Sequence, residues 1–218
     1  MDKKYKAIIF DLDGTLINSI PDIADSMNEV LSVYGYQQYS YNQYKYFVGN
    51  GIRRLVERCV PPECSTPENI ENIFRTMIEV YGNNCISKTA VYNGIPELLD
   101  GLYAKRVKMA ILSNKTDSIT QKICDTLFYD SHFEIALGAT DRFPKKPNPQ
   151  SALFIAESLS VSPDEVFYLG DTSIDMETAC AAGFFPAGVS WGFRPAEELI
   201  SFGAQYIANT PVDCLRFF

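Results

Sequence analysis

The chain has 218 residues, of which 46% are hydrophobic and 21% are charged, and its formal net charge is -8. This length and composition predict a folded protein with one large domain, or with a core domain and a smaller one. The acidic balance argues against a nucleic-acid surface, because phosphate backbones are bound mainly by clustered lysine and arginine. We therefore expect no nucleic-acid partner.

The cysteines and the N-terminal segment indicate the cellular compartment of the protein. Six scattered cysteines, without a Cys-x-x-Cys pair, suggest neither a zinc module nor a small disulfide scaffold. The first apolar run is short and leads straight into aspartates, unlike a signal peptide or a membrane span. We expect a cytoplasmic protein with reduced thiols and no membrane partner, and the sequence leaves open whether it is a monomer or a dimer.

The first part of the chain predicts one strand followed by helices. The unbroken apolar run AIIF at residues 7–10 is typical of a strand that is buried on both faces of a parallel sheet. Residues 18–87 then show helical periodicity in IPDIADSMNEVLSVYGY, GIRRLVERCV and PENIENIFRTMIEVYGNN, with breaks at Gly, Pro and Asn. We expect this segment to form a small helical domain that is inserted into the core.

From residue 88 onward, short apolar runs alternate with amphipathic segments. KMAIL, FEIALG, EVFYLG and FPAGVSW have the character of strands, and DSITQKICDTL, NPQSALFIAESL and DMETACAAG have that of helices. This alternation predicts βαβ units and a parallel sheet covered by helices. The predicted fold is α/β, with a doubly wound, Rossmann-like core at residues 1–17 and 88–218 and a small α-helical domain inserted at residues 18–87.

Polar residues follow the predicted strands at four places, at the edge where an open parallel sheet binds its ligand. They are Asp11 and Asp13, Ser113 and Asn114, Lys145 and Lys146, and Asp171 and Asp175. The crowded carboxylates suit a hard cation such as Mg²⁺, which would neutralise their repulsion. Ser113 and the backbone N–H groups around Gly14 and Thr15 are candidates to bind phosphate oxygens, and a lysine would supply positive charge for the transition state.

These residues resemble the motifs of the haloacid dehalogenase-like hydrolases over essentially the whole chain. DLDGT at residues 11–15 is similar to the first motif, LSN ending in Ser113 and Asn114 to the second, KPNP beginning at Lys146 to the third, and GDTSID at residues 170–175 to the fourth. The resemblance implies that Asp11 is a nucleophile that forms an aspartyl-phosphate and that Asp13 is the general acid and base. It selects Lys146 over Lys145 as the catalytic lysine.

The same resemblance implies a metal site and a cap. Mg²⁺ would be held by Asp11, the Asp13 backbone carbonyl and Asp171, with Asp175 supporting the metal shell. The inserted helices look like the family's helical cap, and FVGNGIRRLVER at residues 47–58 resembles the cap segment of phosphoglycolate phosphatases. Arg53 and Arg54 are candidates to bind an anionic substrate, although a solvated surface role is equally open to them. The favoured function is Mg²⁺-dependent hydrolysis of a small phosphorylated metabolite, and 2-phosphoglycolate is the favoured substrate.

Other functions on the same core stay open. They are a phosphotransferase or isomerase of the β-phosphoglucomutase type, an inorganic pyrophosphatase, and another sugar or nucleotide phosphatase. A dehalogenase is less favoured because it has no use for a metal, and a phosphonatase because Lys45 lies in a stretch unlike that enzyme's lysine motif. A catalytically idle phosphate-binding relative would carry a damaged motif, and all four motifs are intact.

Overall fold

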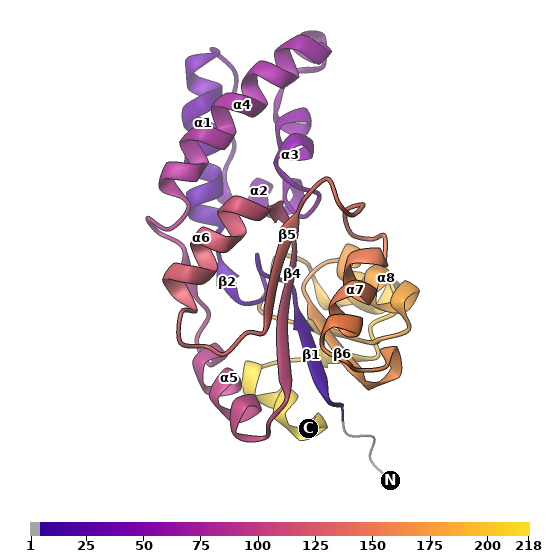
Figure 1. The fold of residues 1–218 in the computed structure, drawn as a ribbon. Helices are drawn as coiled ribbons and strands as arrows, with labels where there is room; N and C mark the ends of the chain where they lie inside the picture. The colour runs from indigo at the N-terminus through magenta and orange to yellow at the C-terminus, as the bar shows by residue number, and fades with distance from the viewer. Residues whose placement is uncertain (1–4) are drawn as a thin grey trace.

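The computed structural model describes residues 5–218, in which a six-stranded sheet carries helices on both faces (Figure 1). The strand order is β5-β4-β1-β6-β7-β8, and every neighbouring pair is parallel. The strands are β1 (Ala7–Phe10), β4 (Lys108–Thr116), β5 (Ile135–Ala139), β6 (Val166–Gly170), β7 (Phe185–Val189) and β8 (Tyr206–Ala208). This confirms the predicted Rossmann-like α/β fold.

Helices cover both faces of the sheet because alternate residues of a strand point to opposite faces. On β1, Ile8 and Phe10 share a buried cluster with side chains of α5 and α6, whereas Ala7 and Ile9 share one with side chains of α7 and α8. The helices that flank the sheet are α5 (Ile95–Ala104), α6 (Asp117–Leu127), α7 (Gln150–Ser158), α8 (Ser173–Ala182) and α9 (Ala196–Ser201). β1 is therefore buried on both faces, as its unbroken apolar run predicts.

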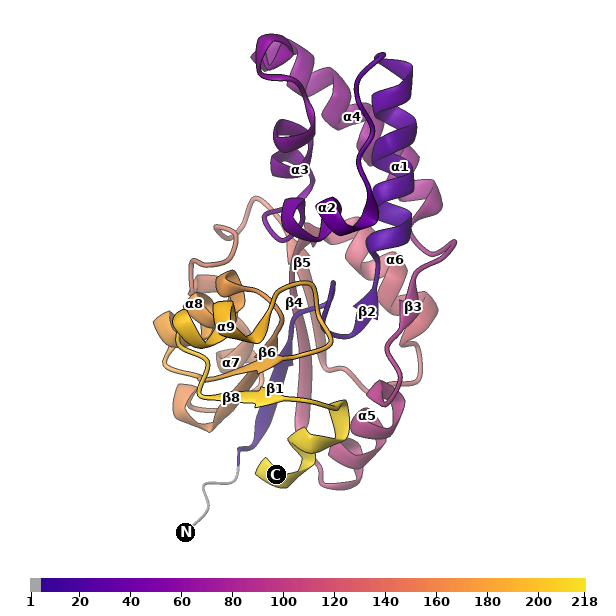
Figure 2. The same cartoon turned by 180° about the vertical axis from the view of Figure 1, so that it is seen from behind.

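The inserted segment forms a group of helices beyond the carboxyl end of the sheet (Figure 2), and we call them the cap helices. They are α1 (Ile20–Val33), α2 (Tyr41–Phe47), α3 (Ile52–Cys59) and α4 (Pro67–Asn84). α4 packs against α1 and α3, and α2 packs between α1 and α3. The periodicity does not predict α2, but a capping box of Ser40 and Gln43 begins it, and its Tyr44 is fully buried.

Two linkers connect the cap helices to the sheet and pair as the short antiparallel strands β2 (Ile17–Asn18) and β3 (Ala90–Val91). Asp22, in the first turn of α1, is only 2% exposed. Its carboxylate accepts hydrogen bonds from the backbone N–H groups of Lys88 and Thr89 and from the Thr89 hydroxyl, at 2.7 to 2.9 Å. The predicted domain boundaries, residues 18–87 within 1–17 and 88–218, lie near these linkers and stay a prediction. Residues 1–4 of that prediction lie outside the described range.

Short helical turns complete the chain: η1 (Pro62–Cys64), η2 (Pro163–Glu165) and η3 (Pro211–Phe217). The last of these packs against α5. Each of the six cysteines lies within the described range and is a free thiol. Within residues 5–218, no helix has the length and the apolar character needed to span a bilayer.

Candidate active site

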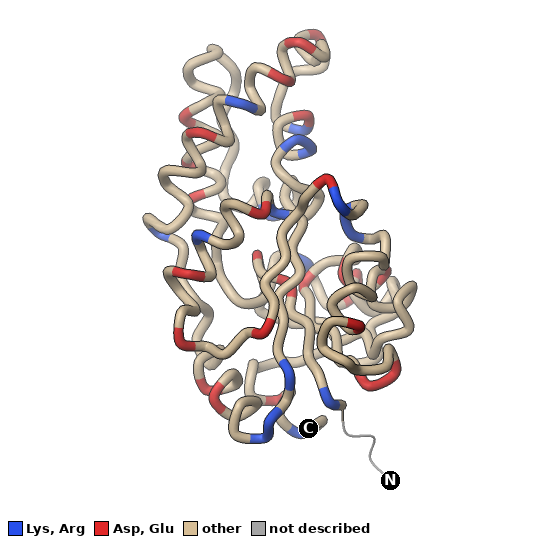
Figure 3. The backbone as a smooth tube through the Cα atoms, in the orientation of Figure 1, with Lys and Arg blue, Asp and Glu red and all other residues tan. Residues whose placement is uncertain are grey.

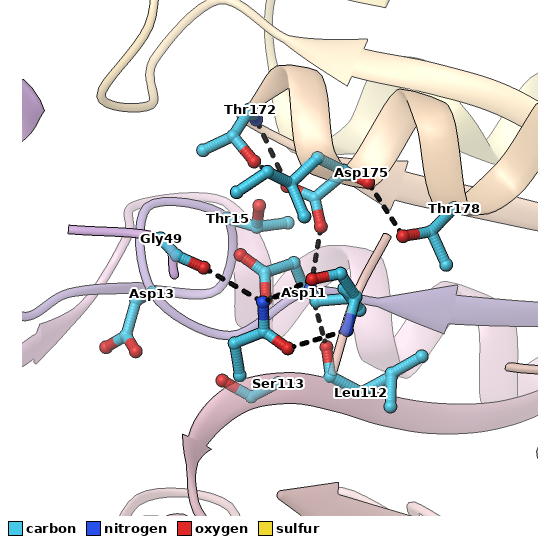
Figure 4. Close-up of polar contacts among 12 residues, drawn as sticks. Asp11, Asp13, Thr15, Gly49, Leu112, Ser113, Thr172, Asp175 and Thr178 are labelled. Carbon is cyan, nitrogen blue, oxygen red and sulfur yellow. Dashed lines mark hydrogen bonds and ion pairs between the residues drawn. The ribbon is translucent and has the colours of Figure 1, made fainter. Parts of the chain in front are cut away.

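The carboxyl ends of β1, β4 and β6 bring the predicted polar residues together, because β1 lies between the other two strands. Asp11 directly follows β1 and Ser113 lies in β4 (Figure 4), and Asp171 directly follows β6. Asp11 and Ser113 border a pocket between the sheet and the cap helices, with about 560 Å³ of empty space including its open mouth. The cap lines this pocket mainly with apolar side chains, among them Ile23 and Leu55.

β4 extends beyond its predicted end and carries part of the site. KMAIL predicts a strand that ends at Leu112, but the strand continues to Thr116, and its register with β5 shifts between these two residues. Such an irregularity redirects side chains that would otherwise alternate between the faces. The Asn114 amide donates hydrogen bonds to the backbone carbonyls of Gly49 at 3.1 Å and Lys146 at 3.0 Å. Asn114 therefore ties a cap loop and the Lys146 loop to the sheet.

The Lys146 ammonium is buried at the centre of the site. Its Nζ lies 2.7 Å from Asp11 Oδ1 and 2.7 Å from Asp175 Oδ1, and it donates a hydrogen bond to the Leu112 carbonyl at 3.0 Å. Burial alone would lower the pKa of Lys146, but the two carboxylates outweigh burial and raise that pKa well above its ordinary value. Lys146 is thus a charged and firmly placed group, whereas its neighbour Lys145 is exposed.

Asp11, Asp171 and Asp175 form a buried cluster whose ligand oxygens all lie within 4.8 Å of one another. Burial raises the pKa of Asp11 to about 7, and the charge of Asp175 adds to the shift. Burial also raises the pKa of Asp171 well above its usual range, with added repulsion from Asp11 and Asp175. The Lys146 ammonium balances only part of this negative charge. An oxygen-only donor set with excess negative charge fits a divalent cation such as Mg²⁺.

The loop DLDGT folds closely around Asp171. A Cβ on Gly14, whose φ is +89°, would lie 2.1 Å from Asp171 Oδ2, and a Cβ on Gly192 would lie 2.3 Å from the Asp171 Cβ. Asp171 accepts hydrogen bonds from the Phe193 N–H at 2.8 Å and from the Thr15 hydroxyl at 3.4 Å. Gly14 is therefore required both by its left-handed backbone and by the close approach of a carboxylate.

The structure places the N–H groups of Gly14 and Thr15 inside the loop, and their role in phosphate binding stays a prediction. The loop closes on itself, so the Gly14 N–H donates to the Ile17 carbonyl at 2.8 Å and the Thr15 N–H to the Leu12 carbonyl at 3.4 Å. Neither residue lines the pocket. Asp13, in the same loop, does line the pocket, and no hydrogen bond from its N–H to the backbone is found within residues 5–218.

Asp13 faces a different part of the pocket from Asp11 (Figure 4). Its Oδ1 accepts a hydrogen bond from the Ser19 hydroxyl and lies 3.0 Å from Lys115 Nζ. Lys115 is buried and donates a hydrogen bond to the Tyr81 hydroxyl of α4. Sequence reasoning missed Lys115 and Tyr81. Lys115 directly follows Asn114, which is the one signal in the sequence that could have found it.

Arg53 and Arg54 are not among the residues that line the pocket, and their role in substrate binding stays a prediction. Arg53 pairs with Glu71 of α4 and lies over the Phe74 ring, with its guanidinium carbon 4.5 Å from the ring centroid. Arg54 pairs with Glu57 at 2.6 Å within α3. Figure 3 shows both signs of charge on α3 and on α4. These arginines therefore belong to the surface ion pairs of the cap helices.

Comparisons with known proteins identify the family of this chain. Residues 8–189 match the family model described as haloacid dehalogenase-like hydrolase. A phosphoglycolate phosphatase from Aquifex aeolicus is 33% identical over 211 residues, which cover 97% of this chain and 95% of the relative. One from Psychrobacter arcticus is 31% identical over 205 residues, covering 91% of this chain and 88% of the relative. A solved structure, named as a predicted phosphoglycolate phosphatase from Haemophilus somnus, has a TM-score of 0.90, 28% identity and 97% coverage of both chains.

Proposed function

Because the chain belongs to the haloacid dehalogenase-like hydrolases, we propose that it is a Mg²⁺-dependent phosphatase of a small phosphorylated metabolite, with 2-phosphoglycolate as the favoured substrate. The relatives named phosphoglycolate phosphatase support this substrate, because they match nearly the whole chain, including the cap helices. One observation carries the chemistry: the Asp11 carboxylate borders the pocket at the end of β1, with the Lys146 ammonium 2.7 Å away. The cytoplasmic location stays part of the proposal.

In the proposed reaction, a carboxylate oxygen of Asp11 attacks the phosphorus and forms an aspartyl-phosphate, while the bond from phosphorus to the ester oxygen breaks. Asp13 gives a proton to the leaving oxygen. It then takes a proton from the water that attacks the aspartyl-phosphate, which releases phosphate and restores Asp11. Asp13 suits this role because it borders the pocket, as Asp11 does.

Other residues hold the phosphoryl group and its charge. The Lys146 ammonium stabilises the negative charge that develops on the phosphoryl oxygens. The Ser113 oxygen already accepts a hydrogen bond from the Lys115 N–H at 3.1 Å, so its hydroxyl proton is free to point to a phosphoryl oxygen. Asn114 places Lys146, because it accepts a hydrogen bond from the Lys146 N–H at 2.9 Å.

The proposal includes a bound Mg²⁺ ion. The carboxylates of Asp11 and Asp171 and the backbone carbonyl of Asp13 would hold it, and Asp175 would support the site through its bond to Lys146. When bound, the ion supplies positive charge that screens the attacking carboxylate from the anionic phosphate. The apolar roof of the pocket, including Ile23 and Leu55, limits competing water during the first step.

The test is phosphate release from five compounds: 2-phosphoglycolate, β-glucose 1-phosphate, pyrophosphate, a nucleoside monophosphate and p-nitrophenyl phosphate. Each is assayed with Mg²⁺ or with EDTA. We expect 2-phosphoglycolate to be preferred, EDTA to abolish turnover, and Asp11→Asn to abolish it while the thermal unfolding curve stays cooperative. Asp25→Asn, at an exposed carboxylate on α1, is the matched control and should keep full activity.

Each other outcome has a definite meaning. Activity spread over the other esters would keep the mechanism and reject the substrate. Isomerised sugar phosphate with little free phosphate would support the alternative function, a phosphotransferase or isomerase of the β-phosphoglucomutase type. A fully active Asp11→Asn variant would contradict the proposed nucleophile.

A further inference from the structure

Two lysines line the pocket among the described residues, and only one of them has its donors filled by the protein. Lys146 contacts two carboxylates and a backbone carbonyl. Within residues 5–218, the Lys115 ammonium has two polar partners, Asp13 Oδ1 at 3.0 Å and the Tyr81 hydroxyl, and it lies 4.5 Å from the centroid of the Tyr81 ring. Because an ammonium carries three N–H donors, Lys115 has one left for a ligand in the pocket.

Lys115 is buried, so a hydrogen-bond donor without a partner on its ammonium is energetically costly. The Lys115 side chain is 3% exposed, and Tyr81 is 1% exposed. Burial alone would lower the pKa of Lys115, but Asp13 and Tyr81 outweigh burial and raise it, so the group stays charged. A buried charge is costly unless its hydrogen bonds are satisfied. An incompletely bonded ammonium at a pocket wall is therefore a natural site for an anionic group.

The position of Lys115 indicates which part of a substrate it meets. In the proposed function, the leaving oxygen lies beside Asp13, which protonates it. Lys115 contacts Asp13, whereas Lys146 contacts Asp11, so the two ammonium groups lie beside different carboxylates of the pocket. The neighbouring cap side chains Ile23 and Leu55 are apolar and offer no competing charge.

We infer that the Lys115 ammonium binds a carboxylate on the substrate's leaving group, and that Tyr81 holds Lys115 in place for this. The inference rests on the proposed function. In 2-phosphoglycolate, a single carbon separates the ester oxygen from the carboxylate. A group that binds this carboxylate must therefore lie directly beside the general acid, as Lys115 does at 3.0 Å from Asp13. Lys115 is then a specificity residue, contributed by the core and positioned by the cap.

The test compares 2-phosphoglycolate with 2-hydroxyethyl phosphate, in which a neutral CH₂OH group replaces the carboxylate. Lys115→Met removes the charge at similar length. Any effect of this change on Asp13 slows both substrates, because both leave through a primary alcohol oxygen, and so it cancels in the ratio of their kcat/KM values. We expect that ratio, taken as 2-phosphoglycolate over 2-hydroxyethyl phosphate, to fall about 10- to 100-fold, mainly through KM for 2-phosphoglycolate.

Lys122→Met is the matched control. Lys122 is an exposed lysine of α6 that donates a hydrogen bond to the Gly82 carbonyl, next to Tyr81 on α4, at 2.7 Å. Lys122→Met removes a contact between the core and α4, the helix that carries Tyr81, without removing a charge from the pocket. We expect the ratio of the two kcat/KM values to stay within about twofold of the wild-type ratio.

Three results would overturn the inference: a wild-type ratio near one, an equal loss for both substrates in Lys115→Met, or the same change of ratio in Lys122→Met. Circular dichroism checks that each variant is folded. If Lys115→Met does not fold, Lys115→Gln keeps a donor for Tyr81 and repeats the comparison, while the wild-type ratio is a test by itself. The proposed function fails in a different way, through the absence of Mg²⁺-dependent phosphate release by the wild type from either ester.

Discussion

The Asp22 carboxylate joins the two linkers between the cap helices and the sheet, and Asp22→Ala tests how much this junction contributes to stability. The change leaves three donors without their acceptor: the N–H groups of Lys88 and Thr89 and the Thr89 hydroxyl. Each buried donor left unsatisfied costs about 1 to 3 kcal/mol. Thr89 is buried, whereas water reaches the exposed Lys88. We therefore expect the free energy of unfolding to fall by about 3 to 5 kcal/mol.

The assay is urea unfolding followed by circular dichroism, with Asp25→Ala as the control. Asp25 also lies on α1, three residues after Asp22. Its carboxylate contacts Lys88, which leads back to the sheet, with Lys88 Nζ at 2.6 Å. The Asp25 side chain is 42% exposed, so its ion pair is screened by water. We expect Asp25→Ala to lower the free energy of unfolding by less than about 1 kcal/mol.

The comparison of the two variants decides whether burial is the cause. If Asp22→Ala costs no more than Asp25→Ala, the hydrogen bonds of Asp22 do not stabilise the junction and the reasoning is refuted. Asp22→Asn refines the result, because an amide keeps one acceptor oxygen at the same position. Its cost should fall between those of the two alanine variants.

Two further predictions concern the site and its surroundings. Gly14→Ala places a methyl group where Asp171 Oδ2 now lies, 2.1 Å from the new Cβ, and forces a positive φ on alanine. We expect kcat to fall about 100-fold or more, measured as phosphate release at saturating Mg²⁺, and wild-type turnover would contradict the packing of this loop. Arg53→Ala and Arg54→Ala remove surface ion pairs outside the pocket. Each should leave KM within about twofold and lower the free energy of unfolding by less than about 1 kcal/mol, whereas a tenfold rise in KM would support their predicted role.

Elements with strong periodicity could be predicted from the sequence, and short ones could not. α4 and α6 begin and end where their amphipathic patterns do, and β1 is buried as its apolar run requires. α2, α9 and β8 are too short to establish a period. They form because neighbouring elements bury their few apolar side chains, which is tertiary information that a single sequence does not express.

In the active site too, some residues could be predicted from the sequence and others could not. The rule that parallel strands present their carboxyl ends at one edge is enough to bring Asp11, Ser113 and Asp171 together. It does not determine the direction of Arg53 and Arg54, because adjacent helical residues point about 100° apart and the packing of α3 on α4 decides which face meets Glu71. Lys115 was missed for a related reason. It lies within β4 beyond the predicted end of that strand at Leu112, so the sequence did not mark it as a strand residue that faces the pocket.

In the proposed function, the two buried lysines divide the pocket into a phosphate end and a leaving-group end. Lys146 is bound by Asp11 and Asp175, and all three residues lie outside the cap helices, so the proposed phosphate end is held by the sheet and its loops. Lys115 depends on Tyr81 of α4, so the leaving-group end is assembled from both parts of the molecule. A change of leaving-group preference therefore needs changes at this second end only. If the inference about Lys115 holds, selection for a carboxylate acts through one core residue and one cap residue, while the phosphoryl chemistry stays unaltered.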